Sequence, residues 1–354
     1  MSGQAIRLRR LRRTAHTLAG RNRGAQPKVV ALGGGMGLSA SLTALRRITG
    51  DLTAVVTVAD DGGSSGRLRE ELGVLPPGDL RKALAALCGD DEWGQTWARV
   101  IQHRFQSKGD LHEHAVGNLL MVALWEQLGD HVQALDLVGK LLGAHGRVLP
   151  MSAVPLELQA LVKGHDPARP DDVETVRGQA TVALTPGEVQ SVHLVPHDPP
   201  AVPEAVAAVR DADWVVLGPG SWFSSVIPHL LVPELLDALV ETKARRVLSL
   251  NLAPQPGETE GFSPQRHLEV LGRHAPKLAL DVVLADEAAV PDRESLADAA
   301  KSLGAAVELA PVALAGGTAQ GGAPGGGVPK HDPELLAAAY DRIFRMHGRI
   351  GPWR

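Results

Sequence analysis

The stretch KVVALGGGMGLSASLTALRRITGDLTAVVTVADDGGSSG, residues 28–66, holds two strand-like segments, and each of them runs into a glycine-rich loop. The apolar residues 28–32 predict a buried strand that enters the loop GGGMG, and a helix is expected over 39–48. A second strand, expected over 52–59, ends at the loop DDGGSSG. Strand, glycine loop, helix and strand in this order predict a right-handed βαβ unit of a parallel sheet.

The alternation of strands and helices returns in the second half of the chain. Residues 213–217, 246–250 and 280–285 predict further buried strands. The first of them ends at the loop GPGS, residues 218–221, and a helix is expected to follow over 224–239. Helices between successive strands favour one doubly wound sheet. The predicted fold class is therefore α/β, with a Rossmann-like, mostly parallel sheet in three layers.

The middle of the chain departs from this alternation. Residues from about 76 to 147 are expected to be mostly helical, and Asp79 is expected to be the N-cap of one of these helices. Segments 148–157 and 178–194 look strand-like. We expect this middle segment to be an elaboration of the same domain.

The domain organisation is predicted from composition. Residues 1–26 form a basic tail that we expect to be disordered, and residues 27–354 form one α/β domain. The glycine run over 315–327 is a loop or linker. It precedes a last helix over 333–344, which Asp332 is expected to cap because proline suits the first helical position.

Composition narrows the class of protein. Cys88 is the only cysteine among 354 residues, which excludes a disulfide framework and a cysteine-based metal cluster, so we expect a reducing compartment. No apolar run approaches the roughly 18 to 20 residues that cross a bilayer. The sequence therefore predicts a cytoplasmic protein without a membrane span, and it leaves a homo-oligomer open.

Charge argues against nucleic acid as the main partner. The tail carries seven of the 36 basic residues and no acid, so the remaining chain, with 29 basic and 40 acidic residues, has a net charge of about −11. A body of this charge is a poor general binder of polyanions. The basic residues of the tail are Arg7, Arg9, Arg10, Arg12, Arg13, Arg21 and Arg23.

The first glycine loop is a candidate phosphate site. Gly34, Gly35 and Gly37 let the backbone turn sharply and bring N–H groups close to an anion at the start of the helix. A P-loop lysine is missing. Gly35-x-Gly37-x-x-Ala40, with Asp60 some twenty residues later, also fits a relaxed dinucleotide fingerprint, so a nicotinamide-binding domain remains an alternative, as does a turn without ligand.

The second loop carries paired acids. Asp60 and Asp61 precede Gly63, Ser64 and further small residues, and then come two arginines. Adjacent carboxylates with flanking arginines suit a polar substrate, or a hydrated Mg²⁺ held between Asp61 and a phosphate. A solvated turn is the alternative. No cofactor is required by the sequence, and Mg²⁺ is the one that it would accommodate.

Two later loops complete the candidate site. Gly218, Gly220 and Ser221 offer backbone N–H groups and a hydroxyl to an anion, or merely cap a helix, and Asn251 at the next strand end could read a base or sugar edge. A helix dipole contributes about 0.3–1 kcal/mol. Micromolar binding needs about 8 kcal/mol, so several loops must converge on one phosphate-bearing ligand, such as a nucleotide.

Two other features are interpreted as structural. His112, Glu113 and His114 resemble a metal cluster, but successive helical positions point in different directions and zinc needs three or four convergent ligands. Cys88 lies in an apolar helical stretch and is expected in the core.

Six ordered motifs resemble those of the YvcK-type gluconeogenesis factors, within the superfamily of 2-phospho-L-lactate transferase (CofD-like). They are ALGGGMGLSASLTALR, VTVADDGGSSGRLRE, PPGDLRKALAAL, H-x-x-GNLL from His114, LGPGSWFSSVIPHLLV and NLAPQPGETEGF. Met36 and Ser65 stand where this family usually has threonine, and Phe223 stands where tyrosine is common. The basic tail and the glycine run lie outside the shared pattern.

The resemblance implies binding of a uridine-diphosphate amino sugar by a regulatory protein required for cell shape and for directing carbon to the cell wall on gluconeogenic carbon sources. It implies ligand contacts at Asn118 and at the glycine and acidic loops named above, with the nucleotide at 218–221 and an acceptor near Asp60 and Asp61. A transferase with a nucleotide-activated donor is the alternative, in which Asp60 and Asp61 are catalytic. The sequence shows no general base beside a nucleophile, which favours a binding protein.

Overall fold

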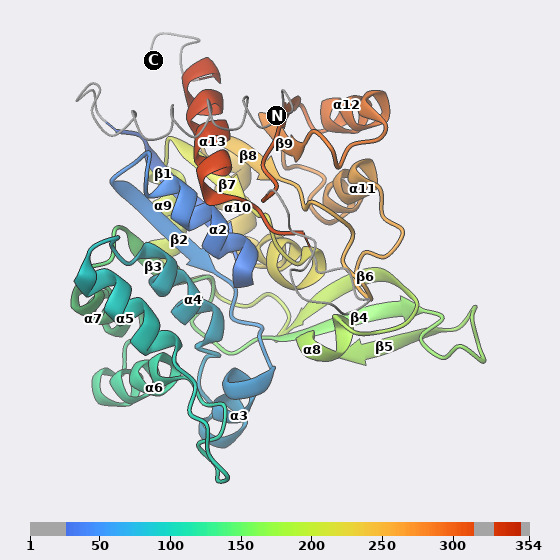
Figure 1. The fold of residues 1–354 in the computed structure, drawn as a ribbon. Coiled ribbons are helices and arrows are strands. Elements are labelled where there is room, and N and C mark those ends of the chain that lie inside the picture. The colour runs from blue at the N-terminus through green and yellow to red at the C-terminus, as the bar shows by residue number, and fades with distance from the viewer. Residues whose placement is uncertain (1–25, 315–328, 348–354) are drawn as a thin grey trace, which may run out of the picture.

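The computed structural model describes residues 26–314 and 329–347 (Figure 1). The predictions for the basic tail and for the glycine run over 315–327 concern residues outside these ranges, apart from Gln26. The predicted βαβ units and the predicted last helix lie within the described residues.

A seven-stranded sheet forms the centre of the described structure, in the order β10-β9-β8-β7-β1-β2-β3, and every neighbouring pair is parallel. The central strands are buried along most of their length, which explains their continuous apolar sequence. Both βαβ halves predicted from the sequence are confirmed. The strands are β1 (Lys28–Gly33), β2 (Asp51–Val56), β3 (Arg147–Pro150), β7 (Trp214–Leu217), β8 (Arg245–Ser249), β9 (Val282–Asp286) and β10 (Ala306–Ala310).

Helices cover both faces of this sheet and make the predicted three layers. On one face lie α2 (Gly35–Leu45), α4 (Gly78–Leu87) and α13 (Pro333–His347), with α13 packed beside α2 in front of the sheet (Figure 1). The opposite layer contains α9 (Pro203–Asp211), α10 (Pro233–Glu241), α11 (Pro264–His274) and α12 (Arg293–Ser302). Right-handed connections place the two sets on opposite faces because the chain runs outward from the centre in two directions.

The middle of the chain is helical, as predicted, and contains α3 (Gly63–Leu72), α5 (Glu92–Gln102), α6 (Val116–Leu128) and α7 (His131–Leu142) besides α4. Asp79, however, is not the N-cap: α4 begins at Gly78, its N-cap is Pro77, and no side chain caps it. The prediction for α13 is confirmed, because Oδ1 of Asp332 accepts from the backbone N–H of Glu334 at 2.8 Å.

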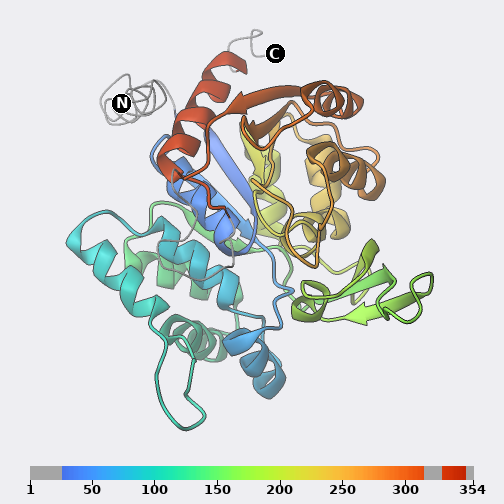
Figure 2. The ribbon, with the colours of Figure 1, turned by 45° about the vertical axis from the view of Figure 1, so that its right-hand side comes forward.

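A three-stranded antiparallel sheet, β5-β4-β6, was not foreseen. It consists of β4 (Glu157–Lys163), β5 (Val173–Arg177) and β6 (Glu188–Val195), with the short α8 (Gln179–Val182) between the last two. The predicted strand over 178–194 therefore begins as a helix, and 148–157 divides between β3 and the start of β4. This sheet and α3 to α7 lie on either side of the end at which β1 and β2 finish (Figures 1 and 2).

The helix expected over 224–239 is broken into three pieces. A π-helical turn, η2 (Trp222–Val226), and a 3₁₀ segment, η3 (Ile227–Leu231), precede α10. Pro228 and Pro233 lack the N–H that a continuous helix needs. Among the residues described here, no single helix has the length and apolar character of a membrane span, although 222–231 and 233–241 together pass that test with an 80° bend between them.

Candidate functional site

The first and third glycine loops meet at the centre of the sheet. The chain leaves β1 toward one face and β7 toward the other, which creates a crevice between these neighbours at the carboxyl ends of the strands. A Cβ on Gly37 would lie 2.2 Å from the carbonyl oxygen of Pro219, so only glycine allows the two loops to touch in this way. The crevice is the place where ligands bind in open α/β sheets.

The start of α2 is held by a carboxylate from the first turn of α4. Gly35 has φ +59° and donates its N–H to Oδ2 of Asp79 at 2.9 Å. A Cβ on Gly34 would lie 2.5 Å from that oxygen and 2.5 Å from Cγ2 of Thr57, which follows β2. The glycines of the first loop are therefore required by close packing against the second loop and α4.

The acids that approach each other are Asp60 and Asp79. A Cβ on Gly78 would lie 2.8 Å from Oδ2 of Asp60, and the pKa of Asp60 is raised, first by burial and then by the negative charge of Asp79. Lys82 donates to Oδ1 of Asp79 at 2.8 Å. The sequence predicted Asp60 as a site residue but not Asp79. Asp79 lies at the start of a predicted helix, a position that indicates a helix cap.

Asp61 turns away from this pair. Its Oδ1 accepts from the backbone N–H of Ala180 at 2.8 Å, at the start of α8. A Cβ on Gly178, which has φ +87°, would lie 2.4 Å from Oδ2 of Asp61. Asp61 thus joins the second loop to the small sheet, and the carboxylate pair predicted from adjacent residues is replaced by a pair from the second loop and α4.

Ser64 links the second loop to the start of α6. Its Oγ lies 3.0 Å from Nδ1 of His114 and accepts from Nδ2 of Asn118 at 2.9 Å. All three side chains are buried. Gly63, with φ +49°, has no atom within 4 Å of its missing Cβ, so it borders open space. The structure therefore brings Asn118 to the second loop.

The amide groups of the third loop are already bonded within the chain. Asn251 accepts from the N–H of Gly220 at 3.0 Å and donates to its carbonyl oxygen at 2.8 Å, so its amide holds the loop. Oε1 of Glu258 accepts from the N–H groups of Phe223 (2.8 Å) and Ser224 (3.0 Å). Its carboxylate also accepts from Oγ of Ser221 at 2.6 Å.

Glu258 is the functional-site residue that the sequence gave least reason to notice. It is 5% exposed, and burial raises its pKa despite the hydrogen bonds that favour its charged form. Phe223 and Ser224 follow the predicted loop 218–221, and within that loop the expectation of a free N–H is wrong for Gly220, which donates to Asn251. The PGET stretch behind Asn251 was the available signal, since an acid there reaches the neighbouring loop.

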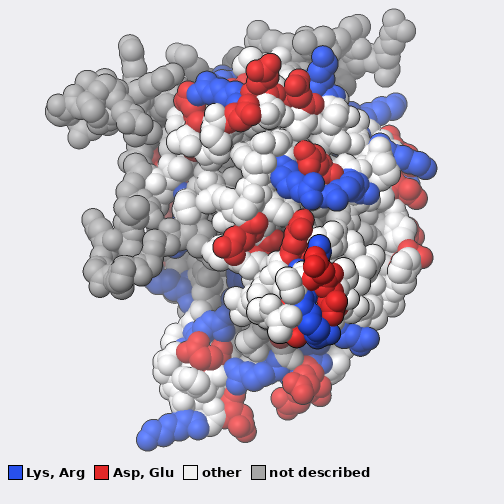
Figure 3. Space-filling view, turned by 90° about the vertical axis from the view of Figure 1, so that its right-hand side faces the viewer, with Lys and Arg blue, Asp and Glu red and all other residues white. Residues whose placement is uncertain are grey.

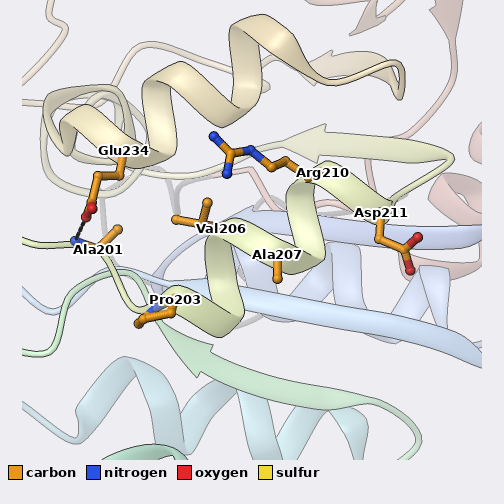
Figure 4. Close-up of a pocket in the computed structure, with 7 residues that line it drawn as sticks. All are labelled: Ala201, Pro203, Val206, Ala207, Arg210, Asp211 and Glu234. Atoms are coloured by element: carbon orange, nitrogen blue, oxygen red, sulfur yellow. Dashed lines mark hydrogen bonds between the residues drawn. The ribbon is translucent and has the colours of Figure 1, made fainter.

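Two open grooves occur among the described residues. One of about 560 Å³ lies at the start of α3 and is lined by Asp61, Gly63, Gly66, Arg67, Arg69 and Glu70. The other, of about 590 Å³, lies between α9 and α10, where Glu234 accepts from the N–H of Ala201 (Figure 4). Only the first adjoins the loops described above.

No group of three or more histidine, cysteine or acidic side chains within the described ranges could hold a metal ion. His114 faces Ser64, while His112 accepts from the N–H of Ser107 through Nδ1 at 3.3 Å. Cys88 is buried, as predicted, and burial raises the pKa of its thiol to about 11. On the face shown in Figure 3, the coloured acidic and basic side chains are interspersed and form no continuous basic field.

Comparison with known proteins agrees with this geometry. The family model described as 2-phospho-L-lactate transferase CofD matches residues 29–314. A relative from Mycobacterium tuberculosis named as a gluconeogenesis factor is 53% identical over 318 residues, which is 89% of this chain and 90% of the relative. The gluconeogenesis factor of Bacillus subtilis is 36% identical over 269 residues, 76% of this chain and 81% of its own length.

A solved structure shows the same fold. The crystal structure of a UPF0052 family member from Bacillus halodurans has 32% sequence identity and a TM-score of 0.76, and the match covers 88% of this chain and 98% of that one. The motif resemblance is thereby confirmed: the chain belongs to the 2-phospho-L-lactate transferase CofD family, among relatives named gluconeogenesis factors.

Proposed function

We propose that the chain binds a nucleotide-sugar, of the UDP-N-acetylglucosamine class, in the crevice between the first and third glycine loops. The observation that carries this proposal is the contact of Gly37 with Pro219, where both loops meet at the topological switch point of the sheet. The groove at the start of α3, which is lined in part by the second loop, offers space for the sugar. Membership of a family of nucleotide-related proteins supports the same ligand class.

The proposed role is regulatory. Binding reports the supply of the nucleotide-sugar, and the protein passes this signal to cell-wall synthesis, and so to cell shape, during growth on gluconeogenic carbon sources. The names of the relatives support the metabolic part of this role. A binding function also suits a site whose carboxylates are engaged by backbone amides and a lysine.

Calorimetry with UDP-N-acetylglucosamine, UDP and NADH tests the ligand class. We expect the sugar nucleotide to bind at least tenfold more tightly than NADH. In Gly37→Ala, the added methyl group must push the two loops apart, so affinity should fall at least tenfold. Gly139→Ala is the matched control, because its Cβ would meet only Cδ2 of Leu84, at 4.0 Å. Equal, weak responses to all three compounds would refute the proposal.

Transfer of a group from a nucleotide-activated donor is the second candidate. The specific observation in its favour is the approach of Asp60 and Asp79, since two carboxylates beside a phosphate site could share Mg²⁺. The raised pKa of Asp60 also suits a base that accepts the proton of an acceptor hydroxyl.

Turnover of a nucleotide donor with and without Mg²⁺ tests this candidate. Asp60→Asn should lower kcat by 10²-fold or more, while Asp298→Asn, an exposed acid on α12, should leave it unchanged. Absence of turnover with every nucleotide donor would refute the transferase candidate, and only the binding function would remain.

A further inference from the structure

Arg81 on α4 is a buried cation with unsatisfied hydrogen-bond donors. Only 4% of the residue is exposed, and neither Nε nor Nη1 of its guanidinium has a partner within the described chain. No ion pair of Arg81 occurs among the described residues either. An unpaired buried charge is strongly unfavourable, so an arginine at this position needs a partner that the chain does not supply.

The nearest charges do not provide this partner. Asp79 is bonded to Gly35 and Lys82, and Asp60 accepts from the N–H of Gly62. Burial first, and then the charge of Arg104, lower the pKa of Arg81 to about 10, which leaves it protonated at neutral pH. Two neighbouring cations would therefore both be stabilised by an anion placed beside Arg81.

A second unpaired group lies on the helix against which Arg81 packs. Arg81 packs against Gly117, whose Cβ would lie 2.9 Å from its Cγ, and Asn118 is the next residue of α6. Oδ1 of Asn118 has no partner, although the residue is 1% exposed and its Nδ2 donates to Ser64. The unsatisfied guanidinium donors of Arg81 and the unsatisfied acceptor of Asn118 thus lie on two helices, α4 and α6, that pack together at Arg81 and Gly117.

We propose that Arg81 and Asn118 form an anion subsite for an oxyanion that carries a neighbouring hydroxyl group. The oxyanion, a phosphate or a carboxylate, accepts from Arg81, and the hydroxyl donates to Oδ1 of Asn118. A bound water could satisfy one donor, but it would add no negative charge to that of Asp79 and Asp60, which oppose the lowering of the pKa of Arg81 without bonding to it. This subsite rests on the proposed function, and it adds the place where an acidic group of the ligand, or of a second ligand, is held.

The engagement of Glu258 strengthens this assignment. Because that carboxylate occupies the amides of Phe223 and Ser224, these groups bind no further anion unless Glu258 moves. Nε and Nη1 of Arg81, in contrast, have no hydrogen-bond partner in the described structure. Between these two places, the guanidinium is the one that is ready to receive negative charge.

Thermal melting in inorganic phosphate and in glycerate, at constant ionic strength against chloride, tests the subsite and separates the two sources of oxyanion. At least one of these anions should raise the melting temperature of the wild-type protein, with a dependence on anion concentration that fits binding at a specific site. Arg81→Met should weaken this response at least tenfold, and Arg81→Lys should retain part of it. Arg99→Met, which removes an exposed arginine of α5, is the matched control.

The melting temperature without anion distinguishes a binding arginine from a structural one. Arg81→Met should melt at or above the wild-type temperature, because an apolar side chain removes the unpaired charge. Should Arg81→Met not fold, Asn118→Asp, of nearly the same shape, should abolish the anion response through repulsion. A lower melting temperature of Arg81→Met with an unchanged anion response, or no response of the wild type to either anion, would overturn the proposal.

Titration of the same variants with UDP-N-acetylglucosamine separates this proposal from the proposed function. Undiminished nucleotide binding by Arg81→Met, without any anion response of the wild type, refutes only the subsite. An anion response that depends on Arg81, without nucleotide binding, supports the subsite and refutes the proposed ligand class.

Discussion

Glu258 illustrates how one side chain changes the chemistry of a loop. Its carboxylate accepts from two N–H groups of η2 and from the hydroxyl of Ser221, so it neutralises the start of that helical segment from within. The energetic cost of burying this acid is visible in its raised pKa. A buried acid with a raised pKa is a source of pH-dependent stability.

The sign of that dependence follows from proton binding. Above the usual glutamate pKa of about 4.3, native Glu258 holds its proton while the unfolded chain has lost it. The native state then binds more protons, so the contribution of Glu258 to the free energy of unfolding falls as pH rises to the raised pKa, and it is level above that. In urea unfolding, the difference between wild type and Glu258→Gln should therefore decline over this range.

Glu269→Gln on α11 is the control, because Glu269 is exposed and pairs only with Arg266 in the described structure. Its difference from the wild type should show no comparable decline. A flat difference for Glu258→Gln would contradict the assignment of a strained buried acid.

Among the helices, α13 stabilises the element that carries the first glycine loop. Tyr340 is fully buried, and its hydroxyl lies 2.8 Å from Oγ of Ser41 on α2 and 2.8 Å from Oγ of Ser249 on β8. Ser41 also donates to the carbonyl oxygen of Gly218. The last helix, the first loop and the third loop are thus joined through one tyrosine.

Tyr340→Phe should lower the free energy of unfolding by about 1–2 kcal/mol, because it leaves two buried serine hydroxyls without their partner. Chemical denaturation measures this change. Tyr340→Phe combined with Ser41→Ala should cost less than the sum of the single changes, since both remove the same hydrogen bond. Strict additivity would show that the contact between α13 and α2 contributes nothing.

Considered as a whole, the molecule places its site where separate parts of the chain meet. Helices α3 to α7 and the small antiparallel sheet flank one end of the central sheet (Figures 1 and 2). His229 of η3 connects this arrangement to the core, because its Nε2 lies 3.1 Å from the carbonyl oxygen of Val55 on β2. Burial lowers the pKa of His229 to about 4.

Acid should therefore destabilise the whole fold. Between pH of about 6.5 and 4 the unfolded chain binds a proton at His229 and the native state does not, so stability is present above this range and is lost as pH falls. The loss is on the order of 3 kcal/mol for a shift of this size. His229→Gln, followed by urea unfolding at each pH, should lack this part of the acid loss, whereas exposed His197→Gln should retain it. Equal acid profiles of His229→Gln and wild type would refute this explanation.

The sequence by itself determined the central sheet and the ends of its strands. Apolar runs with glycine loops behind them predicted β1, β2, β7 and β8, because burial on both faces and sharp turns are local demands on residue type. Strands β5 and β10 escaped this reasoning. Both are only five residues long and partly exposed, so their pattern is weak. The segment 178–194 predicted as strand-like contains most of β6, but its pairing with β4 was not predicted.

Only the tertiary structure decided which side chains share the site. Asp79, and not Asp61, approaches Asp60, and Glu258 fills the start of η2. Each of these contacts joins separate segments of the chain, so local sequence does not reveal it. In the sequence, Arg81 is an ordinary residue of a predicted helix. Its burial and its unsatisfied guanidinium nitrogens are seen only in the tertiary structure. Residue type and spacing specify local conformation, whereas burial and partnership depend on how all the elements are packed together.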